Sequence, residues 1–297
     1  MVVVFGSINL DLVAQVERIP VSGETLVGTA FASFPGGKGA NQALAARRAG
    51  AQVWMFGAVG RDSFATSALT NLEAGGVDLS GVVAVDRPTG VALIHVDAQG
   101  KNAITVVAGA NGAAHAVQVP ASALGPTTTL VLQLEVPMDE IARLVGRARD
   151  ARLILNAAPA LALPSDLLDH ADVLVVNETE AAGVGTAQGL ATAPEAFARA
   201  AAARHGCAVI VTLGAQGAIA VHGREFWVVT APPVKVVDTT GAGDALVGAV
   251  AAALDRGAPL HQALKEGVAA GSLACTGHGA QAPLPLQDAI VALAATL

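Results

Sequence analysis

The stretch Asp238-Thr239-Thr240-Gly241-Ala242-Gly243-Asp244 places small residues between two carboxylates and leads into a long alanine-rich segment of helical composition. Backbone N–H groups at a glycine-rich helix start bind phosphate oxygens, and the positive end of the helix dipole assists them. Asp244 could accept a proton from a hydroxyl brought up to that phosphate. A turn with an N-capping carboxylate would have the same composition, so this stretch alone does not decide between the two interpretations.

Two further motifs near the N-terminus combine glycines with polar side chains. Asn9 and Asp11 follow the first apolar run, and in an extended segment they point the same way, which suits two neighbouring hydroxyls of a polyol. An Asx turn is the alternative. In Phe34 to Ala43, paired glycines permit close approach of a ligand, but Lys38 is followed by Gly39, so the motif is not a Walker A loop. A plain strand-to-helix turn is the alternative here.

Polar residues also follow the later apolar runs. Glu135 and Asn156 each end one run, where ligands collect in an open parallel sheet. A helix cap is the alternative for the Glu135 carboxylate. Asn177 and Glu180 are three residues apart, which predicts either a helix capping box or a carboxylate that orients the waters of a Mg²⁺ ion. The segment Thr212 to Gly217 could wrap a nucleotide, although a glycine-bearing hairpin turn would have the same sequence.

The composition excludes several classes of protein. Hydrophobic residues make up 53% and charged residues 14% of the 297 residues, which is enough for a large core. The net charge of -7, the 3% aromatic content and the lack of a Lys/Arg run argue against a nucleic-acid partner. Cys207 and Cys275 form no C-x-x-C pair, which predicts reduced thiols in the cytoplasm. No signal peptide is expected, and charged residues interrupt the apolar stretches near Ala201 and Ala251, so no membrane span or membrane partner is predicted.

Short β-branched runs alternate with alanine-rich helical patterns, which predicts an α/β fold with a mostly parallel sheet and helices on both faces. The predicted strands are Val2 to Phe5, Val53 to Phe56, Leu130 to Leu134, Leu153 to Leu155, Val173 to Val176 and Val209 to Leu213. The predicted helices include Gly39 to Ala49, Ser63 to Ala74, Met138 to Asp150 and Pro194 to His205. Leu12 to Phe34 and Thr89 to Val107 alternate polar and apolar residues, so we expect a small projecting sheet, with antiparallel additions at the sheet edge as the alternative.

In this order the motifs resemble those of the ribokinase branch of the PfkB carbohydrate kinase family, from Val3 to about Pro285. Gly36 to Ala43 resembles the N-terminal signature, and Asp238 to Asp244 resembles the C-terminal one. The resemblance implies a Rossmann-type three-layer core of residues 1–11, 35–88 and 108–297. It also implies a β-sheet lid of residues 12–34 and 89–107, through which we expect a homodimer to form.

The implied activity is ATP-dependent transfer of the γ-phosphoryl group to the primary hydroxyl of a pentose, with D-ribose as the expected substrate. The sugar ligands would be Asn9, Asp11, Gly37, Lys38, Asn41, Glu135 and Asp244. The nucleotide ligands would be Asn177, Thr212, Gly214, Gly217 and Gly243. Asp244 would be the base, and the N–H groups of Gly241, Ala242 and Gly243 would stabilise the transferred group, a division of labour expected for phosphoryl transfer.

Two metal ions are also implied by the resemblance. Glu180 would act on Mg²⁺ through its water shell. A monovalent cation, K⁺, would lie near Asp238, Thr240, Cys275, His278 and Ala280. The sequence departs from the family pattern at Val268, near the expected adenine, and at Leu246, where a Phe is common.

The alternatives are kinases for 2-deoxyribose, another sugar or a nucleoside, and a non-catalytic sugar or nucleotide sensor. The low aromatic content disfavours a nucleoside substrate, and Asp244 beside its glycines disfavours a sensor.

Overall fold

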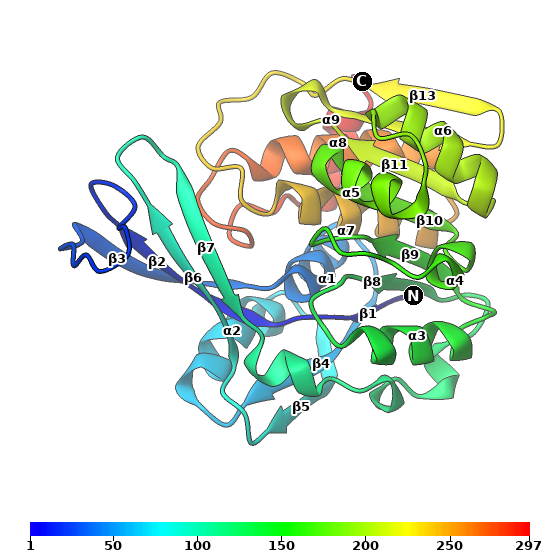
Figure 1. Cartoon of the computed structure of the whole chain (residues 1–297). Helices are drawn as coiled ribbons and strands as arrows, with labels where there is room; N and C mark the ends of the chain where they lie inside the picture. Colours follow the sequence, from blue (N-terminus) through cyan, green and yellow to red (C-terminus); the bar gives the residue numbers. More distant parts are fainter.

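The computed structural model describes residues 1–297, and its centre is a nine-stranded sheet (Figure 1). Its strand order is β13-β12-β11-β10-β9-β8-β1-β4-β5. The seven strands from β11 to β5 are parallel, while β12 and β13 add antiparallel at one edge. The strands are β1 (Val2–Phe5), β4 (Val53–Gly60), β5 (Asp78–Val85), β8 (Thr129–Leu132), β9 (Arg152–Asn156), β10 (Val173–Asn177), β11 (Ala208–Thr212), β12 (Ala218–His222) and β13 (Glu225–Val229).

Helices cover both faces of this sheet, as the alternation of apolar runs predicts. In β1, Val2 and Val4 face one hydrophobic cluster, while Val3 and Phe5 face the other. The first cluster is covered by α1 (Lys38–Arg48), α2 (Ser63–Ala74), α7 (Ala242–Asp255), α8 (Leu260–Ala274) and α9 (Gln287–Ala294). The second is covered by α3 (Met138–Arg147), α4 (Ser165–Asp169), α5 (Glu178–Gln188) and α6 (Pro194–His205). Short 3₁₀ turns lie at η1 (Gly109–Ala113), η2 (Ala116–Gln118), η3 (Ala121–Ala123) and η4 (Gly214–Gln216).

Helices α1 and α7 pack unusually close together because small residues line their contact. A Cβ atom placed on Gly248 of α7 would lie only 2.4 Å from the Cβ of Ala45 in α1 and 2.7 Å from the carbonyl oxygen of Gln42. The alanine-rich composition of both helices therefore brings their backbones together. Their N-terminal ends consequently lie near one another at the same edge of the sheet.

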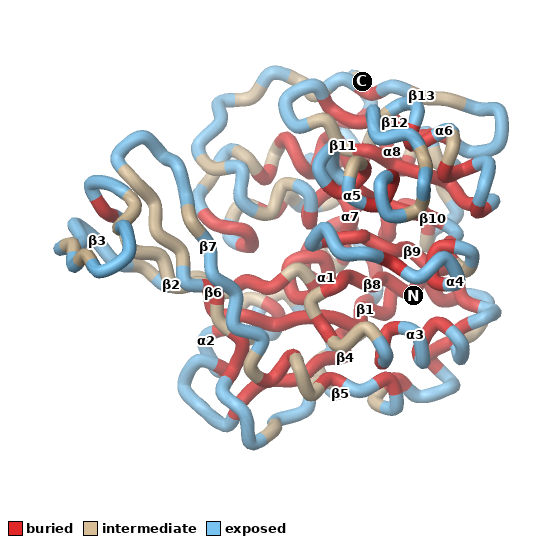
Figure 2. The backbone as a smooth tube through the Cα atoms, in the orientation of Figure 1, coloured by how far each residue is buried: buried red, intermediate tan, exposed pale blue.

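A second sheet of four strands projects from the core (Figure 1), and Figure 2 shows that it is far less buried than the central sheet. Its order is β3 (Ala30–Gly36), β2 (Asn9–Gln15), β6 (Gly90–Val96) and β7 (Asn102–Val107). The small projecting sheet expected from the sequence is confirmed, although residues 16–29 form no strand. Strands β2 and β3 also extend beyond residues 12–34, since β2 begins at Asn9 and β3 ends at Gly36.

The predicted strands of the core and helices α2 and α6 agree with the structure, whereas three strands were not predicted. Strand β5 alternates exposed and half-buried residues, and the β12–β13 hairpin forms the edge of the sheet. Helix α3 ends at Arg147 rather than Asp150. None of the helices has the length and apolar character that a membrane crossing requires.

Candidate active site

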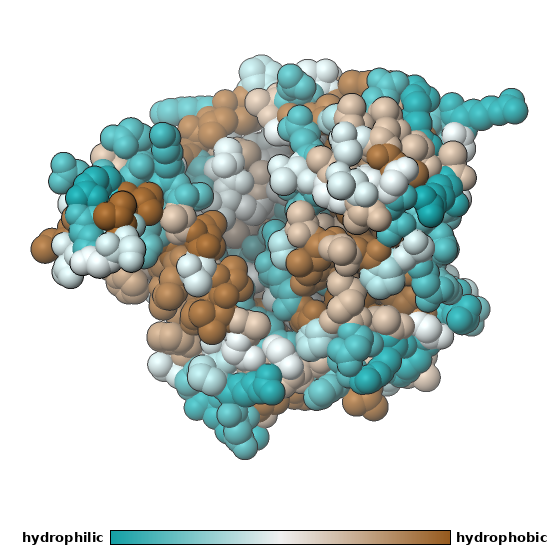
Figure 3. Space-filling model, viewed as in Figure 1, coloured by the Kyte–Doolittle hydropathy of each residue, from teal (hydrophilic) through white to brown (hydrophobic).

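The polar residues that follow the parallel strands meet at one edge of the central sheet. Strands β1, β8, β9, β10 and β11 all end there, because parallel strands share their carboxyl edge. Helices α1 and α7 begin at this edge, and strands β2 and β3 of the projecting sheet start and end beside it. Figure 3 shows a hollow between the projecting sheet and the core. The candidate site lies at this edge.

The predicted glycine cradle forms the start of α7. Gly241 is the N-cap residue with φ of 76°, and a Cβ atom there would lie 2.8 Å from Cα of Ala280, so both conformation and space require glycine. A Cβ atom on Gly243 would meet no protein atom within 4 Å, which leaves open space in front of the helix. The N–H groups of Gly241 and Gly243 have no backbone acceptor, whereas that of Ala242 points to the carbonyl of Thr239 at 3.3 Å.

Asp244 is buried in the first turn of α7 and is held by two side-chain amides. The Nδ2 of Asn41 donates to its Oδ2 at 2.9 Å, and the Nε2 of Gln42 donates to its Oδ1 at 2.8 Å. Both amides belong to α1, which approaches through the close contact with α7. Gln42 was missed in the sequence because its alanine-rich surroundings indicate only a buried helix.

Asn9 and Asp11 lie in β2 as an extended pair, as their spacing predicts. The Oδ1 of Asn9 accepts a hydrogen bond of 2.7 Å from Nδ2 of Asn111, so the Asn9 amide presents its own NH₂ group elsewhere. Asn111 also binds the backbone N–H and carbonyl of Ile8 at 2.8 and 3.2 Å. No sequence motif marks Asn111, because the turn that carries it lies about one hundred residues from Asn9.

Glu135 is fixed by two donors from the N-terminal part of the chain. Its Oε2 accepts from the hydroxyl of Ser7 at 2.5 Å and from the backbone N–H of Lys38 at 3.1 Å. The N–H of Gly39 in turn donates to Ser7 Oγ at 3.3 Å. Glu135 is thereby joined to the glycine loop that opens α1. Ser7 was not singled out, since a serine after a strand is too common to be informative.

Lys38 is the lysine whose charge acts on four carboxylates in this site. Its pKa is raised overall: the charge of Asp244 raises it most, burial opposes this, and Glu135, Glu180 and Asp11 raise it further. Burial and the charges of Glu135 and Asp244 raise the pKa of Asp11 to about 7, against a partial opposing effect of Lys38. The site is therefore rich in negative charge before any cation enters.

The expected nucleotide residues line a cavity of about 500 Å³ beside the cradle. Thr212, Gly214, Gly217 and Gly243 all contribute to it, while Asn177 does not line it and lies beside Thr212 at the end of β10. The cavity also contains both departures from the family pattern, Val268 and Leu246. Ala242 of the cradle and Cys275 of the expected cation site also line the cavity. Residues assigned to no site from the sequence complete its mainly apolar wall: Ala215, Ala231, Pro232, Pro233, Val234, Val236, Thr239, Gly271 and Ser272.

The segment from β11 to β12 is a hairpin connection that also lines this cavity. Leu213 N–H donates to the carbonyl of Gly217 at 2.8 Å, and the flanking strands pair antiparallel. The two interpretations of the Thr212 to Gly217 stretch, a turn and a nucleotide wall, are thus compatible.

Asn177 and Glu180 form the capping box that was one of the two predicted alternatives. Asn177 Oδ1 accepts from the N–H of Glu180, and Glu180 Oε2 accepts from the N–H of Asn177, both at 2.8 Å. The pKa of Glu180 is raised overall, with burial as the largest cause. The hydrogen bond from Asn177 and the charge of Lys38 oppose this, and the charge of Asp244 adds to it. The capping role leaves the second carboxylate oxygen without a protein donor.

Asp238 ties the segment before α7 to the loop after α8. Its Oδ1 accepts from Thr240 N–H and hydroxyl at 2.9 and 2.7 Å, and its Oδ2 accepts from Gly279 N–H at 2.9 Å. Burial raises the pKa of Asp238, but these hydrogen bonds lower it below its ordinary value. The carbonyl of Cys275 accepts from Val237 and Asp238 N–H groups at 2.8 and 3.3 Å. A carboxylate, a hydroxyl and the Cys275 carbonyl thus lie together beside the loop that carries Gly279 and Ala280.

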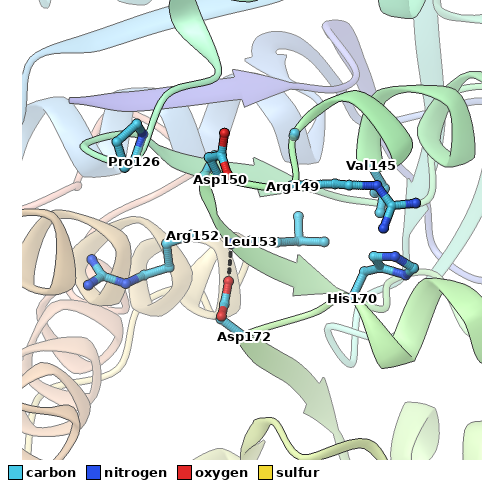
Figure 4. A pocket seen from close by; sticks show the side chains of 10 residues that line it. Pro126, Val145, Arg149, Asp150, Arg152, Leu153, His170 and Asp172 are labelled. Atoms are coloured by element: carbon cyan, nitrogen blue, oxygen red, sulfur yellow. Dashed lines mark hydrogen bonds between the residues drawn. The ribbon is translucent and has the colours of Figure 1, made fainter.

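A second cavity of about 400 Å³ lies at the opposite, amino edge of the sheet (Figure 4). Its charged side chains do not converge: Arg152 points away from Arg149 and His170, and donates to the carbonyl of Leu254 at 2.6 Å. Asp172 accepts from the N–H of Leu153 at 2.7 Å. These groups stabilise strand starts, so the carboxyl edge remains the candidate active site.

Comparison with known proteins identifies the family of this chain. The model of the pfkB family carbohydrate kinases matches residues 1–287 of this chain. The ribokinase of Bacillus subtilis is 37% identical over 296 residues, covering 97% of each chain. The structure of Arabidopsis thaliana ribokinase complexed with ribose and ATP superimposes with a TM-score of 0.88 at 30% identity, covering 99% of this chain and 98% of that one. Thermotoga maritima ribokinase gives a TM-score of 0.90 at 31% identity over 98% of both chains. The chain therefore belongs to the PfkB family of carbohydrate kinases.

Proposed function

We propose that this carbohydrate kinase transfers the γ-phosphoryl group of ATP to the primary hydroxyl of D-ribose, giving D-ribose 5-phosphate. The observation that carries the proposal is the position of Asp244. Its carboxylate lies in the first turn of α7, directly after Gly243, which lines the nucleotide cavity. The same carboxylate accepts a hydrogen bond from Asn41, which lies in the first turn of α1 directly after the glycine loop of the sugar site. Asp244 thus lies where a sugar hydroxyl and a terminal phosphate would meet.

In the proposed reaction the protein positions two substrates and removes one proton. Asn9, Asp11, Gly37, Lys38, Asn41 and Glu135 hold the sugar. Asp244 accepts the proton of the primary hydroxyl, whose oxygen then bonds to the γ-phosphorus as the bond to ADP breaks. The free N–H groups of Gly241 and Gly243 stabilise the charge on the transferred group. The N–H of Ala242 would join them by exchanging its long bond to the Thr239 carbonyl for a phosphoryl oxygen. Asn177, Thr212, Gly214 and Gly217 line the nucleotide path.

Two metal ions fit the residues present. The free oxygen of Glu180 suits a Mg²⁺ ion that keeps its water shell, and the ion would neutralise phosphate charge. The oxygen groups of Asp238 and Thr240, with carbonyls near Cys275, His278 and Ala280, are of the kind that K⁺ accepts. Asp238 stays ionised there, since hydrogen bonds keep its pKa low.

The relatives support ribose and also name one competitor. Ribokinases from several organisms are 33–37% identical to this chain, and the deoxyribokinase of Salmonella typhi is 34% identical over 292 residues. We favour ribose because Asp11 and Asn9 offer a carboxylate and an amide to neighbouring hydroxyls. 2-Deoxyribose remains the second candidate.

We further propose that the projecting sheet serves as a lid and that a homodimer forms through it. We also propose that the enzyme acts in the cytoplasm, where ATP is made available. The lid face that carries Asp11 also carries Ile104 and Val106, whose exposed fractions are 54% and 52%. Apolar side chains exposed beside a substrate site are suited to contact with the same face of a second copy.

A coupled ADP-release assay tests the function with D-ribose, 2-deoxyribose, other pentoses and adenosine, each with and without K⁺. We expect the largest kcat/KM for D-ribose. Turnover of ATP that does not rise with D-ribose refutes the substrate, and a total lack of sugar-dependent turnover favours a non-catalytic sensor. The Asp244→Asn variant should lose kcat by orders of magnitude while still binding the sugar. A near-normal kcat in that variant would refute the base assignment.

A further inference from the structure

Five buried side-chain amides form hydrogen-bonded chains that lead to Asp244. They come from separate parts of the chain: Asn41, Gln42, Gln133, Asn156 and Gln281. Only Asn41 was assigned to the substrate. The other four belong to none of the substrate or metal groups described above, and burying an amide is costly unless its hydrogen bonds serve the fold or the site.

The amides form two chains that end on the two oxygens of Asp244. In the first, Gln133 Nε2 donates to Gln42 Oε1 at 2.7 Å, and Gln42 Nε2 donates to Asp244 Oδ1 at 2.8 Å. In the second, Gln281 Nε2 donates to Asn41 Oδ1 at 3.0 Å, and Asn41 Nδ2 donates to Asp244 Oδ2 at 2.9 Å. Every bond in both chains donates toward the carboxylate.

This common direction follows from the charge of Asp244. An ionised carboxylate only accepts, so Gln42 must turn its NH₂ group toward it and its oxygen toward Gln133. Gln133 must then present its own NH₂ group, which leaves its Oε1 buried without a partner. Gln281 Oε1 is left without a partner in the same way. Both oxygens of Asp244 therefore receive a donor, while the side-chain oxygens of Gln133 and Gln281 at the other ends of the two chains receive none.

Gln42 is the residue whose orientation matters most. Its Nε2 donates to Asn156 Oδ1 at 2.9 Å as well as to Asp244, and Asn156 Nδ2 donates to the carbonyl of Val175 in β10 at 3.1 Å. Because Asn156 is tied to the backbone of the central sheet, Gln42 places Asp244 relative to that sheet. Its fully buried side chain has no freedom to reach solvent.

We propose that Gln42 and Gln133 are positioning residues, which hold Asp244 ionised and correctly oriented through an ordered chain of amide donors. The proposal depends on the assignment of Asp244 as the base. Gln42 acts directly on the carboxylate, and Gln133 acts only through Gln42. Donors to the charged form of an acid stabilise that form, and Lys38, Glu180 and Asp11 are the charged groups that act on Asp244 from outside the two amide chains.

The test is the pH dependence of kcat, measured at saturating D-ribose and ATP, for Gln42→Met and Gln133→Met. Methionine keeps the length of the side chain but donates no hydrogen bond. We expect the acid limb of the Gln42→Met profile to move upward by about one pH unit or more, as for loss of a donor to a charged group. Gln133→Met should shift it in the same direction by less, while the KM for ATP changes less than about twofold in both.

Gln188→Met is the matched control, because Gln188 donates to the carbonyl of Leu163 at the far end of α5, away from Asp244. It should leave the pH profile unchanged. A purely structural role for Gln42 and Gln133 would lower the thermal midpoint without moving the pH limb, and that result overturns the proposal. Gln133→Met keeps the test decisive if Gln42→Met does not fold.

The Asp244→Asn variant distinguishes a failure of the positioning role from a failure of the base assignment. If it is inactive while both methionine variants keep the wild-type profile, only the positioning role is wrong. If it retains a near-normal kcat, the base assignment fails and the positioning role fails with it.

Discussion

The raised pKa of Asp11 predicts that this residue lowers the stability of the substrate-free enzyme at neutral and higher pH. The ordinary value is 3.8 and the folded value is about 7, with burial as the largest cause. Well below the ordinary pKa of 3.8 the carboxyl group is protonated in both states and costs nothing. As the pH rises toward 7, the unfolded chain ionises while the folded protein retains the proton, so folding stability falls. Above pH 7 the full cost is present.

The magnitude follows from the difference between the two pKa values. Each unit of pKa corresponds to about 1.4 kcal/mol, so the gap between 3.8 and about 7 corresponds to about 4 kcal/mol at pH 8. Asp11 is only half-buried, and solvent reduces the cost to about 2 to 4 kcal/mol. Asp11→Asn removes the ionisable group and keeps its shape. We therefore expect the variant to be more stable than the wild type at pH 8, with much of the gain lost at pH 5.

Thermal unfolding at pH 5 and pH 8, without sugar, measures this difference. The gain in midpoint at pH 8 should exceed that at pH 5 by several degrees, since about 1 kcal/mol shifts the midpoint of a protein of this size by about 2 to 4 °C. Asp86→Asn is the control, because Asp86 is an exposed carboxylate that pairs with Arg61 outside the site. Equal gains at both pH values, or a loss at pH 8, would refute the reasoning. The same variant should bind D-ribose poorly, as expected where function is maintained at the expense of stability.

Two further substitutions test the site. Gly243→Ala adds a Cβ atom that meets no protein atom, so the thermal midpoint should not change. The methyl group should obstruct the phosphate and lower kcat/KM for ATP at least about tenfold. Steady-state kinetics with wild-type values would contradict this. Asn111→Ala removes the donor that orients Asn9. The KM for D-ribose should therefore rise about 5- to 10-fold while the KM for ATP stays unchanged. An equal rise in both KM values would indicate a general loss of structure instead.

The sequence predicts the residues that lie in contiguous motifs better than those that support them. The glycine cradle, the Asn9 and Asp11 pair and the Gly36 to Ala43 loop can be found because several unusual residues occur together. The parallel sheet could be predicted because β1 and its neighbours are buried on both faces and read as continuous apolar runs.

The supporting residues could not be found in the same way, because each is a single polar residue in an ordinary setting. Gln133 and Gln281 reach the site only through the fold, which brings β8 and the loop after α8 against α1. The apolar wall from Ala231 to Val236 carries no chemical signal beyond its paired prolines. Strand β5 was missed because it lies at the sheet edge, where its side chains alternate between half-buried and exposed positions.

The close contact of α1 with α7 fixes the span between the two substrate loops by backbone contact rather than by flexible side chains. Gly248 touches Ala45 and the backbone of Gln42, and none of these groups has rotamers to change. Thermal motion of side chains therefore hardly alters the distance between the loop that opens α1 and the cradle that opens α7. Because the chain has few aromatic residues, alanine and glycine form this contact, and the two helices together hold the distance over which the phosphoryl group must move nearly constant.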